Sequence, residues 1–560
     1  MKAIIDAQRF FRFIYLFIFT ILSAAAAQTT YIPTGHWIYD YLNRLETRRV
    51  IPVALNSTQP MTRHELALLL EKIDTSRLNN TEQQQLDYLR LEFQEEWSID
   101  ENEALPSRWS SITRHPWIDP WLPDVIYANQ RNFLSYKTGP LKVFWDPIFL
   151  RGRMWAAADS LDHTEKVFYD TNGFRLRGTI WNVGFYTDIR DTREWGTRRY
   201  GHGNTTLPGF GFAQASGDQV YHDETIAYLV YQWKNLVLQF GKDSNSWGPG
   251  HFGHMLLSQR ATSYDQFKLQ LSFPRFKFTS MIGWLKHYNP FYYRGASIDK
   301  MITAHRLECA PWTWLQFGIH ETVIFSGRTF EPAYLNPVMF YRSAEHYLGD
   351  QDNAAMGLDA ELFLLPQTKI YGELFIDDMQ TQKIFTDYYG NKIGWLAGLY
   401  HVDVFSLPNI DAVIEYARIR PYVYSHKFYT TSYTHFGTGL GHWIGPNADV
   451  LTAQLQYRPS HRFFAHATTQ WYRHAESENN INTGGNIHDP HKGTDPLNVA
   501  FLQGQKIKQW SFNVGVDYKI IYHIYMHASL RFHQTQVEPF ENSSTQFRRE
   551  GRIGISINDF

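Results

Sequence analysis

The chain has little that would stabilise it covalently and, past its N-terminal region, nothing that would cross a membrane as a helix. Cys309 is the single cysteine among 560 residues, so an internal disulfide is excluded. No later run approaches the about 18 apolar residues that a membrane-spanning helix needs. The net charge of −2 excludes the strongly positive potential typical of nucleic-acid-binding proteins. Stability must therefore come from packing and backbone pairing, and we expect no nucleic-acid partner.

The sequence also lacks the motifs that identify common catalytic sites. It contains no G-x-S-x-G, no H-E-x-x-H, no P-loop and no cysteine cluster. Ser–His–Asp trios can be drawn among its 24 histidines, but triads are recognised by geometry and not by position in the chain. Residues 350–353 offer oxygens for Ca²⁺ but lack the length and glycine placement of an EF-hand loop. We therefore expect a protein that is not an enzyme and holds neither metal nor cofactor, with an outer-membrane hydrolase as one alternative.

The N-terminus has the three parts of a secretory signal peptide. Basic residues lie within 2–12, an apolar run of about ten residues follows over 13–22, and Ala25-Ala26-Ala27 fit an A-x-A cleavage site. We therefore expect residues 1–27 to be removed during secretion.

The next part of the chain has helical periodicity. Apolar side chains recur at helical spacing over 37–45, 62–70 and 81–97, and Thr62 with Glu65 fits a capping box. This predicts a small helical periplasmic domain over residues 28–110. Such a domain would bind peptidoglycan or another periplasmic partner, or would pack against the mouth of whatever follows.

The remaining sequence alternates apolar and polar residues, as in strands with one apolar face and one wet face. Clear examples lie at 267–273, 451–458 and 523–533, and aromatic residues make up 16% of the chain. Tight connections alternate with long segments such as 322–357, which is the pattern of outer-membrane barrels with short periplasmic turns and long extracellular loops. The tight connections are expected at 234–235, 274–275, 310–312, 366–369, 406–410, 458–461 and 519–522.

This pattern predicts a transmembrane antiparallel β-barrel of about 18 strands over residues 111–560, in contact with outer-membrane lipid. The alternating residues 552–557 and the terminal Phe560 are similar to the assembly signal of outer-membrane barrels, so we expect the barrel-assembly machinery as a partner. Phe560 is out of phase with the alternation, which would require a bulge or a frayed end.

Charged residues also fall in or beside the predicted strands. A charge that faces lipid costs about 2–4 kcal/mol near the midplane, so these residues are expected to face the lumen. There they would form a salt-bridge network that fixes a plug or, alternatively, would set ion selectivity. The residues are Arg306, Glu308, Glu373, Asp377, Glu415 and Arg418.

Three long loops combine aromatic rings with amide, carboxylate and guanidinium groups. Sugar binding uses flat aromatic faces for the apolar faces of the rings and planar polar groups for the hydroxyls. Loops of this composition also fold inward to plug a wide barrel. We expect the ligand surface, or the anchors of such a plug, among Asp243, Asn245, Trp247, Arg342, Glu345, Asp352, Asn353, Arg418, Tyr422 and Trp443.

The same three loops carry a family resemblance. They read GKDSNSWGPG over 241–250 with MLLS over 255–258, LNPVMFYRSAEH with GDQDN over 335–353, and EYARIRPYVYSH over 415–426. Together and in this order they resemble the Wzi family of outer-membrane capsule-assembly proteins, over most of the mature chain.

The resemblance implies a loop-plugged barrel in the cell outer membrane that binds surface polysaccharide. Its implied function is that of a lectin-like protein that assembles or attaches capsular or extracellular polysaccharide. An outer-membrane porin or solute channel is the first alternative, because a wide barrel would conduct if its loops left the lumen open.

Overall fold

The computed structural model describes residues 29–96, 131–158, 164–197, 213–287, 298–478, 480–521, 523–538 and 545–558. The predicted signal peptide, the predicted domain boundary at residue 110 and Phe560 lie outside the described residues.

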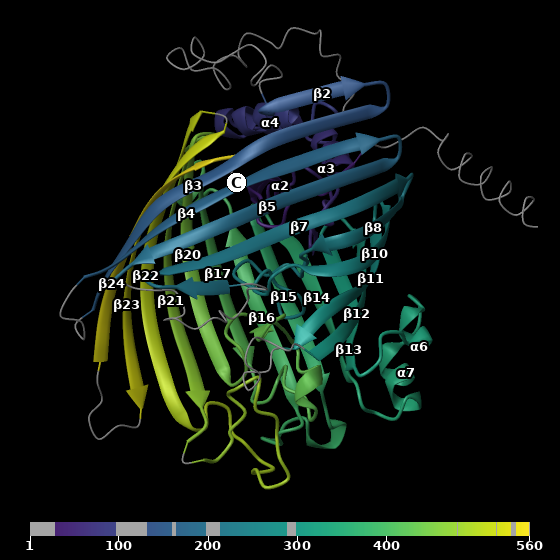
Figure 1. The fold of residues 1–560 in the computed structure, drawn as a ribbon, viewed down its shortest axis with the longest axis vertical. Helices are drawn as coiled ribbons and strands as arrows, with labels where there is room; N and C mark the ends of the chain where they lie inside the picture. The colour runs from purple at the N-terminus through teal and green to yellow at the C-terminus, as the bar shows by residue number, and fades with distance from the viewer. Residues whose placement is uncertain are drawn as a thin grey trace, which may run out of the picture.

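A closed antiparallel barrel forms the body of the described chain, and eighteen strands complete its wall (Figure 1). The prediction of an antiparallel barrel of about this size is confirmed, and the pairing of the last strand with the first long one closes the wall. The wall strands are β3 (Leu141–Ala158), β4 (Glu165–Ile180), β5 (Val183–Gly196), β7 (Gln219–Trp233), β8 (Leu236–Asp243), β10 (Tyr264–Phe273), β11 (Phe276–His287), β12 (Ile298–Trp312), β13 (Leu315–Ser326), β14 (Asn353–Leu365), β15 (Thr368–Asp378), β16 (Lys392–His401), β17 (Ile410–Ile419), β20 (Ala448–Ser460), β21 (Phe463–Glu476), β22 (Gln505–Ile521), β23 (Ile524–Glu538) and β24 (Thr545–Ile557).

Short strands and helical turns supplement this wall. β2 (Leu134–Thr138) pairs with β3, and β6 (Ala213–Ser216) pairs with β7. The loops contain the pair β18 (Thr434–His435) and β19 (Thr438–Gly439), and the 3₁₀ turns η4 (Thr381–Lys383), η5 (Val404–Ser406) and η6 (Tyr429–Thr431).

Tight turns alternate with long loops, as predicted. Turns at 234–235 and 274–275 join their strands as expected, and the connection predicted at 366–369 is shorter, at 366–367, because β15 begins at Thr368. The turn predicted at 310–312 is wrong in its position, because β12 continues to Trp312. A register shift between Cys309 and Trp312 accommodates Pro311, which has no N–H to donate to the ladder.

The outer face of the wall is apolar and is bordered by exposed tryptophans. Trp233 and Trp312 lie near the short turns, and Trp284 and Trp471 lie near the long loops. Leu229, Ile319 and Leu358 are among the exposed apolar side chains of the strands between these belts. Aromatic belts on either side of an apolar band are typical of a bilayer-spanning barrel. Among the described helices, none has the length and apolar character needed to cross a membrane.

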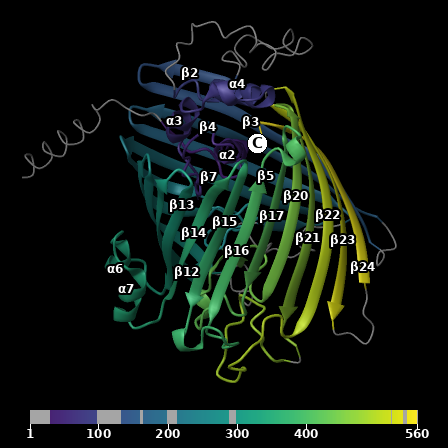
Figure 2. The same cartoon turned by 180° about the vertical axis from the view of Figure 1, so that it is seen from behind.

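The N-terminal segment folds into helices that lie within the short-turn end of the barrel (Figure 2). They are α2 (Trp37–Thr47), η1 (Thr75–Arg77), α3 (Arg63–Glu71) and α4 (Asn80–Glu92). Thr62 accepts a hydrogen bond from the N–H of Glu65, but the Glu65 carboxylate does not complete a capping box and pairs instead with Lys277 of β11 at 2.8 Å. The capping box forms at Asn79 and Glu82 of α4.

Buried ion pairs fix this helical segment, residues 29–96, which we call the plug. Arg44 of α2 pairs with Glu82 of α4 at 3.0 Å, with Asp403 at 2.6 Å and with Asp411 of β17. Thr81 donates to the carbonyl of Pro459 beside a short turn, at 3.1 Å. The plug is therefore bonded both to the wall and to the turns at its end.

A second segment, residues 244–258, crosses the lumen beyond the plug. Its strand β9 (Ser246–Trp247) pairs with β1 (Thr58–Gln59) of the plug. Trp247 lies in the largest apolar cluster of the lumen with Met255 and Leu256. The plug and this segment thus form one continuous filling.

Carboxylates on the inner face of the wall hold this filling, as predicted. Glu373 accepts from the N–H of Gly250 at 2.9 Å and of Met255 at 2.6 Å, and Glu415 accepts from the N–H of His251 at 2.7 Å. Glu308 accepts from the N–H of Ser57 at 3.1 Å. Several of these carboxylates accept hydrogen bonds from backbone N–H groups, whereas the prediction was a network of salt bridges between side chains.

The prediction that Arg418 faces the lumen is wrong. Its neighbours Ala417 and Ile419 are fully buried on the inner face, so the alternation of β17 turns Arg418 outward. Its guanidinium lies 3.8 Å from the ring centroid of Phe501 near the loop end of the barrel. A cation–π contact at the edge of the wall is compatible with an outward charge that would be costly at mid-membrane.

Candidate functional site

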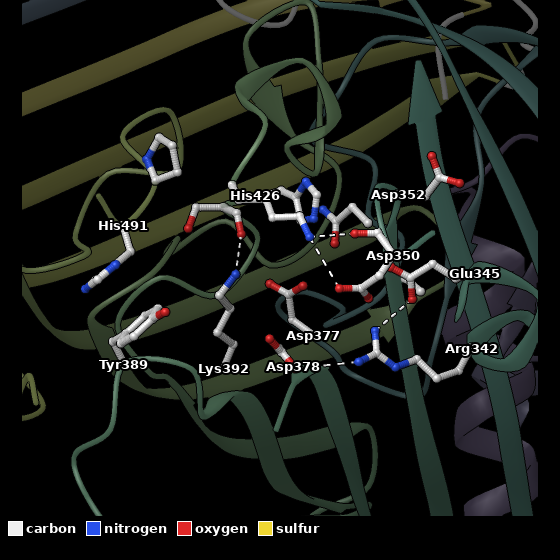
Figure 3. A pocket seen from close by; sticks show the side chains of 15 residues that line it. Arg342, Glu345, Asp350, Asp352, Asp377, Asp378, Tyr389, Lys392, His426 and His491 are labelled. Carbon is white, nitrogen blue, oxygen red and sulfur yellow. Dashed lines mark hydrogen bonds and ion pairs between the residues drawn. The ribbon is translucent and has the colours of Figure 1, made fainter. Parts of the chain in front are cut away.

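A hollow lies at the loop end of the barrel, between α7 (Tyr341–Tyr347), the ends of β14, β15 and β16, and two further loops (Figure 3). Its volume is about 170 Å³. We call it the loop-end cavity. Its lining comprises Arg342, Glu345, Asp350, Asp352, Asn353, Ala354, Asp377, Asp378, Tyr389, Lys392, Ser425, His426, Lys427, Pro490 and His491.

Three cationic side chains reach into the cavity from different elements. Arg342 of α7 donates to Glu345 at 2.7 Å and lies 3.9 Å from Asp378. Lys427 lies 3.4 Å from the carboxylate of Asp350, and both side chains are at least half exposed. Lys392 donates to the carbonyl of Ser425 at 2.7 Å. Arg342 and Lys427 keep part of their surface open, so a ligand can bind them without displacing buried structure.

Buried polar side chains form the wall behind these cations. Asp352 accepts from the hydroxyl of Tyr334 at 2.7 Å and from Arg328 at 3.2 Å. Asn353 donates to the carbonyl of Thr431 at 2.9 Å. Both side chains are therefore engaged with the protein, and they shape the cavity by holding the strand end against the loops.

Glu345 is the buried acid closest to the cavity's arginine. Burial raises the pKa of Glu345 to about 7, with Asp350 and Asp352 adding to the rise and Arg342 opposing it. The charge of this carboxylate therefore changes near neutral pH. When it is protonated, Arg342 loses its principal partner.

An aromatic surface forms the opposite side of the cavity. The rings of Tyr389 and His491 stack with centroids 3.5 Å apart, and Tyr422 packs edge-on against Tyr389 at 6.0 Å. Burial and the neighbouring Lys392 and Lys427 lower the pKa of His426 to about 3, so its ring is neutral at physiological pH. The cavity thus combines exposed cations, carboxylates and stacked rings.

Among the described residues, Glu345, His346 and Asp350 place ligand atoms within 4.8 Å of one another. Arg342 already neutralises Glu345, and the other two residues are exposed. The group thus offers one buried carboxylate and two exposed ligand side chains.

The structure brings together four of the ten predicted site residues, Arg342, Glu345, Asp352 and Asn353. The other six lie elsewhere in the barrel. Asp243, Asn245 and Trp247 are buried in the lumen, where Asn245 donates to Gln266 at 2.7 Å. Tyr422 lies behind Tyr389, Trp443 packs against Tyr472, and Arg418 faces outward.

Several lining residues were not predicted from the sequence, notably Tyr389, Lys392, Lys427 and His491. His426 is the last residue of the distinctive segment 415–426, and its place in that segment is the only feature of the sequence that indicated a role for it. Tyr389, Lys427 and His491 lie in long connections whose local sequence does not distinguish them from ordinary loop residues, and Lys392 is the first residue of β16.

Comparison with known proteins gives a family. The model of the capsule assembly protein Wzi family matches residues 193–547, which is more than half of the chain. Among solved structures, the chain is similar to Wzi of Escherichia coli, described as an outer-membrane, carbohydrate-binding β-barrel involved in group 1 capsule assembly. The two share 14% identity and a TM-score of 0.54 over 94% of this chain and 99% of that one.

OprD of Pseudomonas aeruginosa overlaps with 74% of this chain and 94% of its own, at 10% identity and a TM-score of 0.40. OccAB1 of Acinetobacter baumannii overlaps with 74% of this chain and 96% of its own, at 9% identity and a TM-score of 0.40. No curated protein sequence matches the chain.

The architecture and the family agree with each other. A closed barrel with an apolar outer band, bordered by aromatic residues, lies in the outer membrane. The matched region includes all three loop segments that carried the resemblance. The chain belongs to the Wzi family of capsule assembly proteins.

Proposed function

We propose that the protein is a non-enzymatic, lectin-like component of the outer membrane that binds capsular or other extracellular polysaccharide and assembles or attaches it at the cell surface. The loop-end cavity carries this proposal. It lies at the end away from the short turns, which is the extracellular end in barrels of this kind.

The chemistry of the cavity suits a saccharide that carries acidic groups. Arg342 and Lys427 present partly open cations for carboxylate or other anionic substituents, and the carboxylates of Asp350 and Asp378 can accept from hydroxyls. The stacked rings of Tyr389 and His491 offer an apolar surface to a sugar ring.

The filled lumen supports a binding role over a conducting one. The plug occupies the short-turn end, and residues 244–258 cross the lumen above it through bonds to Glu373 and Glu415. A solute path through this part of the lumen would require breaking these buried bonds. The purified protein can be tested in a planar lipid bilayer. Conductance no higher than that of the bilayer without protein would support the binding role, and sustained single-channel conductance would favour the porin alternative.

The test in cells is the partition of polysaccharide between the cell-bound and shed fractions. Deleting the gene is expected to move polymer into the medium without reducing the total. Complementation with an Arg342→Ala, Lys427→Ala double variant should leave that defect uncorrected, because both open cations are removed.

The matched control is Lys508→Ala, which removes an exposed ion pair with Glu538 on the wall, away from the cavity. This variant should restore attachment fully. Full restoration by the double variant, with normal barrel in the membrane, would refute the assignment of the cavity.

A further inference from the structure

The loop between β13 and β14 does not fold over the barrel mouth. Its helices α6 (Pro332–Leu335) and α7 lie beside the wall in both views (Figures 1 and 2). We call residues 327–352 the lateral segment. It packs on the outer face of the wall, because its side chains Tyr334 and Tyr341 cluster with Met301, Val323, Phe325 and Ala354, which are outward-facing positions of β12, β13 and β14.

The covered wall positions lie within the apolar band. On β12 the outward-facing residues run from Trp312 near the short turns through Leu307 and His305 to Met301, which pairs with the belt residue Trp284. The ring of Tyr341 lies 4.3 Å from that of His305, nearer the short turns than the Trp284 belt. The lateral segment thus reaches past the aromatic belt toward the membrane interior.

Wall residues that the lateral segment does not cover begin directly beside the contact between Tyr341 and His305. Tyr341 donates its N–H to Glu321 of β13 at 3.0 Å, and Ile319, the next outward residue on that strand, is 53% exposed. Leu358, the partner of Ile319 on β14, is 51% exposed. The exposed surface of the lateral segment therefore continues the lipid-facing surface of the barrel.

The lateral segment also shields polar wall residues from lipid. Glu321 and His305 face outward and contact each other at 3.1 Å, yet both are largely covered. A carboxylate at this level would carry a large desolvation penalty if it faced acyl chains. The backbone N–H of Tyr341 donates to the carboxylate of Glu321. This outward-facing carboxylate of the wall therefore depends on α7 for both a hydrogen bond and cover from lipid.

The outer surface of the lateral segment is apolar and its charges are paired. Val338 is 83% exposed and Tyr347 is 90% exposed, and Phe330 and Phe340 are also exposed. Arg328 pairs with Glu331 at 3.1 Å, and Arg342 pairs with Glu345 at 2.7 Å. The exposed Asp350 pairs with Lys427, outside the segment. Exposed aromatic and aliphatic residues with paired charges beside them suit the boundary between headgroups and acyl chains.

We propose that the lateral segment is a membrane-inserted element, and that Phe330, Val338, Phe340 and Tyr347 contact the outer leaflet of the membrane. The protein would then contact lipid through the outer face of its strands and also through the lateral segment, which enters the outer leaflet without crossing the membrane. Because α7 also supplies Arg342 and Glu345, the attachment fixes the loop-end cavity at the level of the lipid headgroups.

Fluorescent labels at single cysteines test the proposal in vesicles of phosphatidylcholine. A Cys309→Ala background frees the chain of its native thiol, and Val338→Cys and Tyr347→Cys carry a bimane label. Phe385→Cys is the matched control, because Phe385 is 97% exposed and lies in the β15–β16 connection. Each label is quenched in parallel by lipids with brominated acyl chains and by aqueous iodide.

Labels at 338 and 347 are expected to show a ratio of lipid to iodide quenching roughly threefold or more above the ratio at 385. Equal ratios at the three positions would overturn the proposal. Protection of 338 and 347 from both quenchers would also overturn it, because a protein surface would then cover the segment. Both positions are highly exposed, so the labels should not disturb folding, and heat-modifiable migration in gels checks that each variant is folded.

Discussion

The two ends of the barrel use the same kinds of residue in different ways. At the short-turn end, Arg44 is buried and its guanidinium is shared by the carboxylates of Glu82, Asp403 and Asp411. At the loop end, Arg342 and Lys427 meet Glu345 and Asp350 beside a hollow and remain partly open.

The difference separates charges that hold the fold from charges that can bind a ligand. A fully buried ion pair is lost at high cost, since the remaining partner is left uncompensated. A half-exposed pair contributes little to stability and can exchange its partner. Variants at the two ends should therefore separate stability from binding.

The largest effect is expected from Arg44→Met in the plug. The buried carboxylates of Glu82 and Asp411 and the partly buried one of Asp403 would lose their shared cation, which should lower the free energy of unfolding by about 3–5 kcal/mol. Urea unfolding in detergent micelles measures the change. Lys508→Met, which breaks the exposed pair with Glu538 on the wall, is the control, and it should change stability by less than about 1 kcal/mol. Equal losses of stability in the two variants would contradict the view that buried ion pairs stabilise the fold more than exposed ones.

At the loop end, Arg342→Ala should weaken ligand binding and leave the stability of the fold almost unchanged. Unfolding should change by less than about 1 kcal/mol, because this arginine is partly exposed and the buried Glu345 that it leaves behind has a pKa raised to about 7 and can take up a proton. Affinity for the host's polysaccharide should fall roughly tenfold, as loss of a charge-assisted contact implies. Calorimetric titration and urea unfolding of the same preparation give both values. A large loss of stability with unchanged binding would assign Arg342 to the fold.

Acidification should strengthen binding of an acidic polysaccharide at this end. The pKa of Glu345 is about 7, so its carboxylate takes up a proton as the pH falls from 8 to 6, and Arg342 becomes free for an anion. Glu345→Gln should abolish this pH dependence and bind at pH 8 as the unaltered protein does at pH 6. A pH profile that is the same in both proteins would contradict the role of Glu345.

The same proton has a defined effect on stability. The folded pKa of Glu345 lies above the ordinary value, so the folded state binds more protons between about pH 4.5 and 7. Its contribution therefore becomes more favourable as the pH falls through 7 and less favourable as the pH rises.

The smallest effect is expected from Tyr389→Ala. Removing one ring of the Tyr389–His491 stack should weaken saccharide binding by about 1 kcal/mol, or roughly fivefold. Tyr389→Phe keeps the ring and should bind almost normally. If both variants lost affinity equally, the hydroxyl and not the aromatic face would be the important group.

The sequence predicted the barrel because its signals are local. Alternation of period two and tight turns such as 274–275 are set by neighbouring residues, and they survive in the structure. Side-chain direction is more fragile, because a shift of one position exchanges lumen and lipid. Arg418 shows this, since the buried Ala417 and Ile419 turn it outward.

The cavity could be predicted only in part because distant loops build it. Arg342, Tyr389, His426 and His491 come from four separate connections, and only the closed wall brings them together. Trp247 shows the opposite case. Its aromatic side chain in a glycine-rich loop suggested a ligand surface, but the pairing of β9 with the plug buries it.

The pairing of β1 with β9 also constrains the order of assembly. Thr58, within the N-terminal segment, is paired with Trp247, far along the chain, and both lie inside a wall that is sealed by β3 and β24. The seam uses the last strand to be synthesised, whereas the plug is among the first parts to emerge. Because this pair lies inside the closed wall, we expect the plug to be in place before β3 and β24 join, and we expect a damaged plug to slow insertion of the barrel.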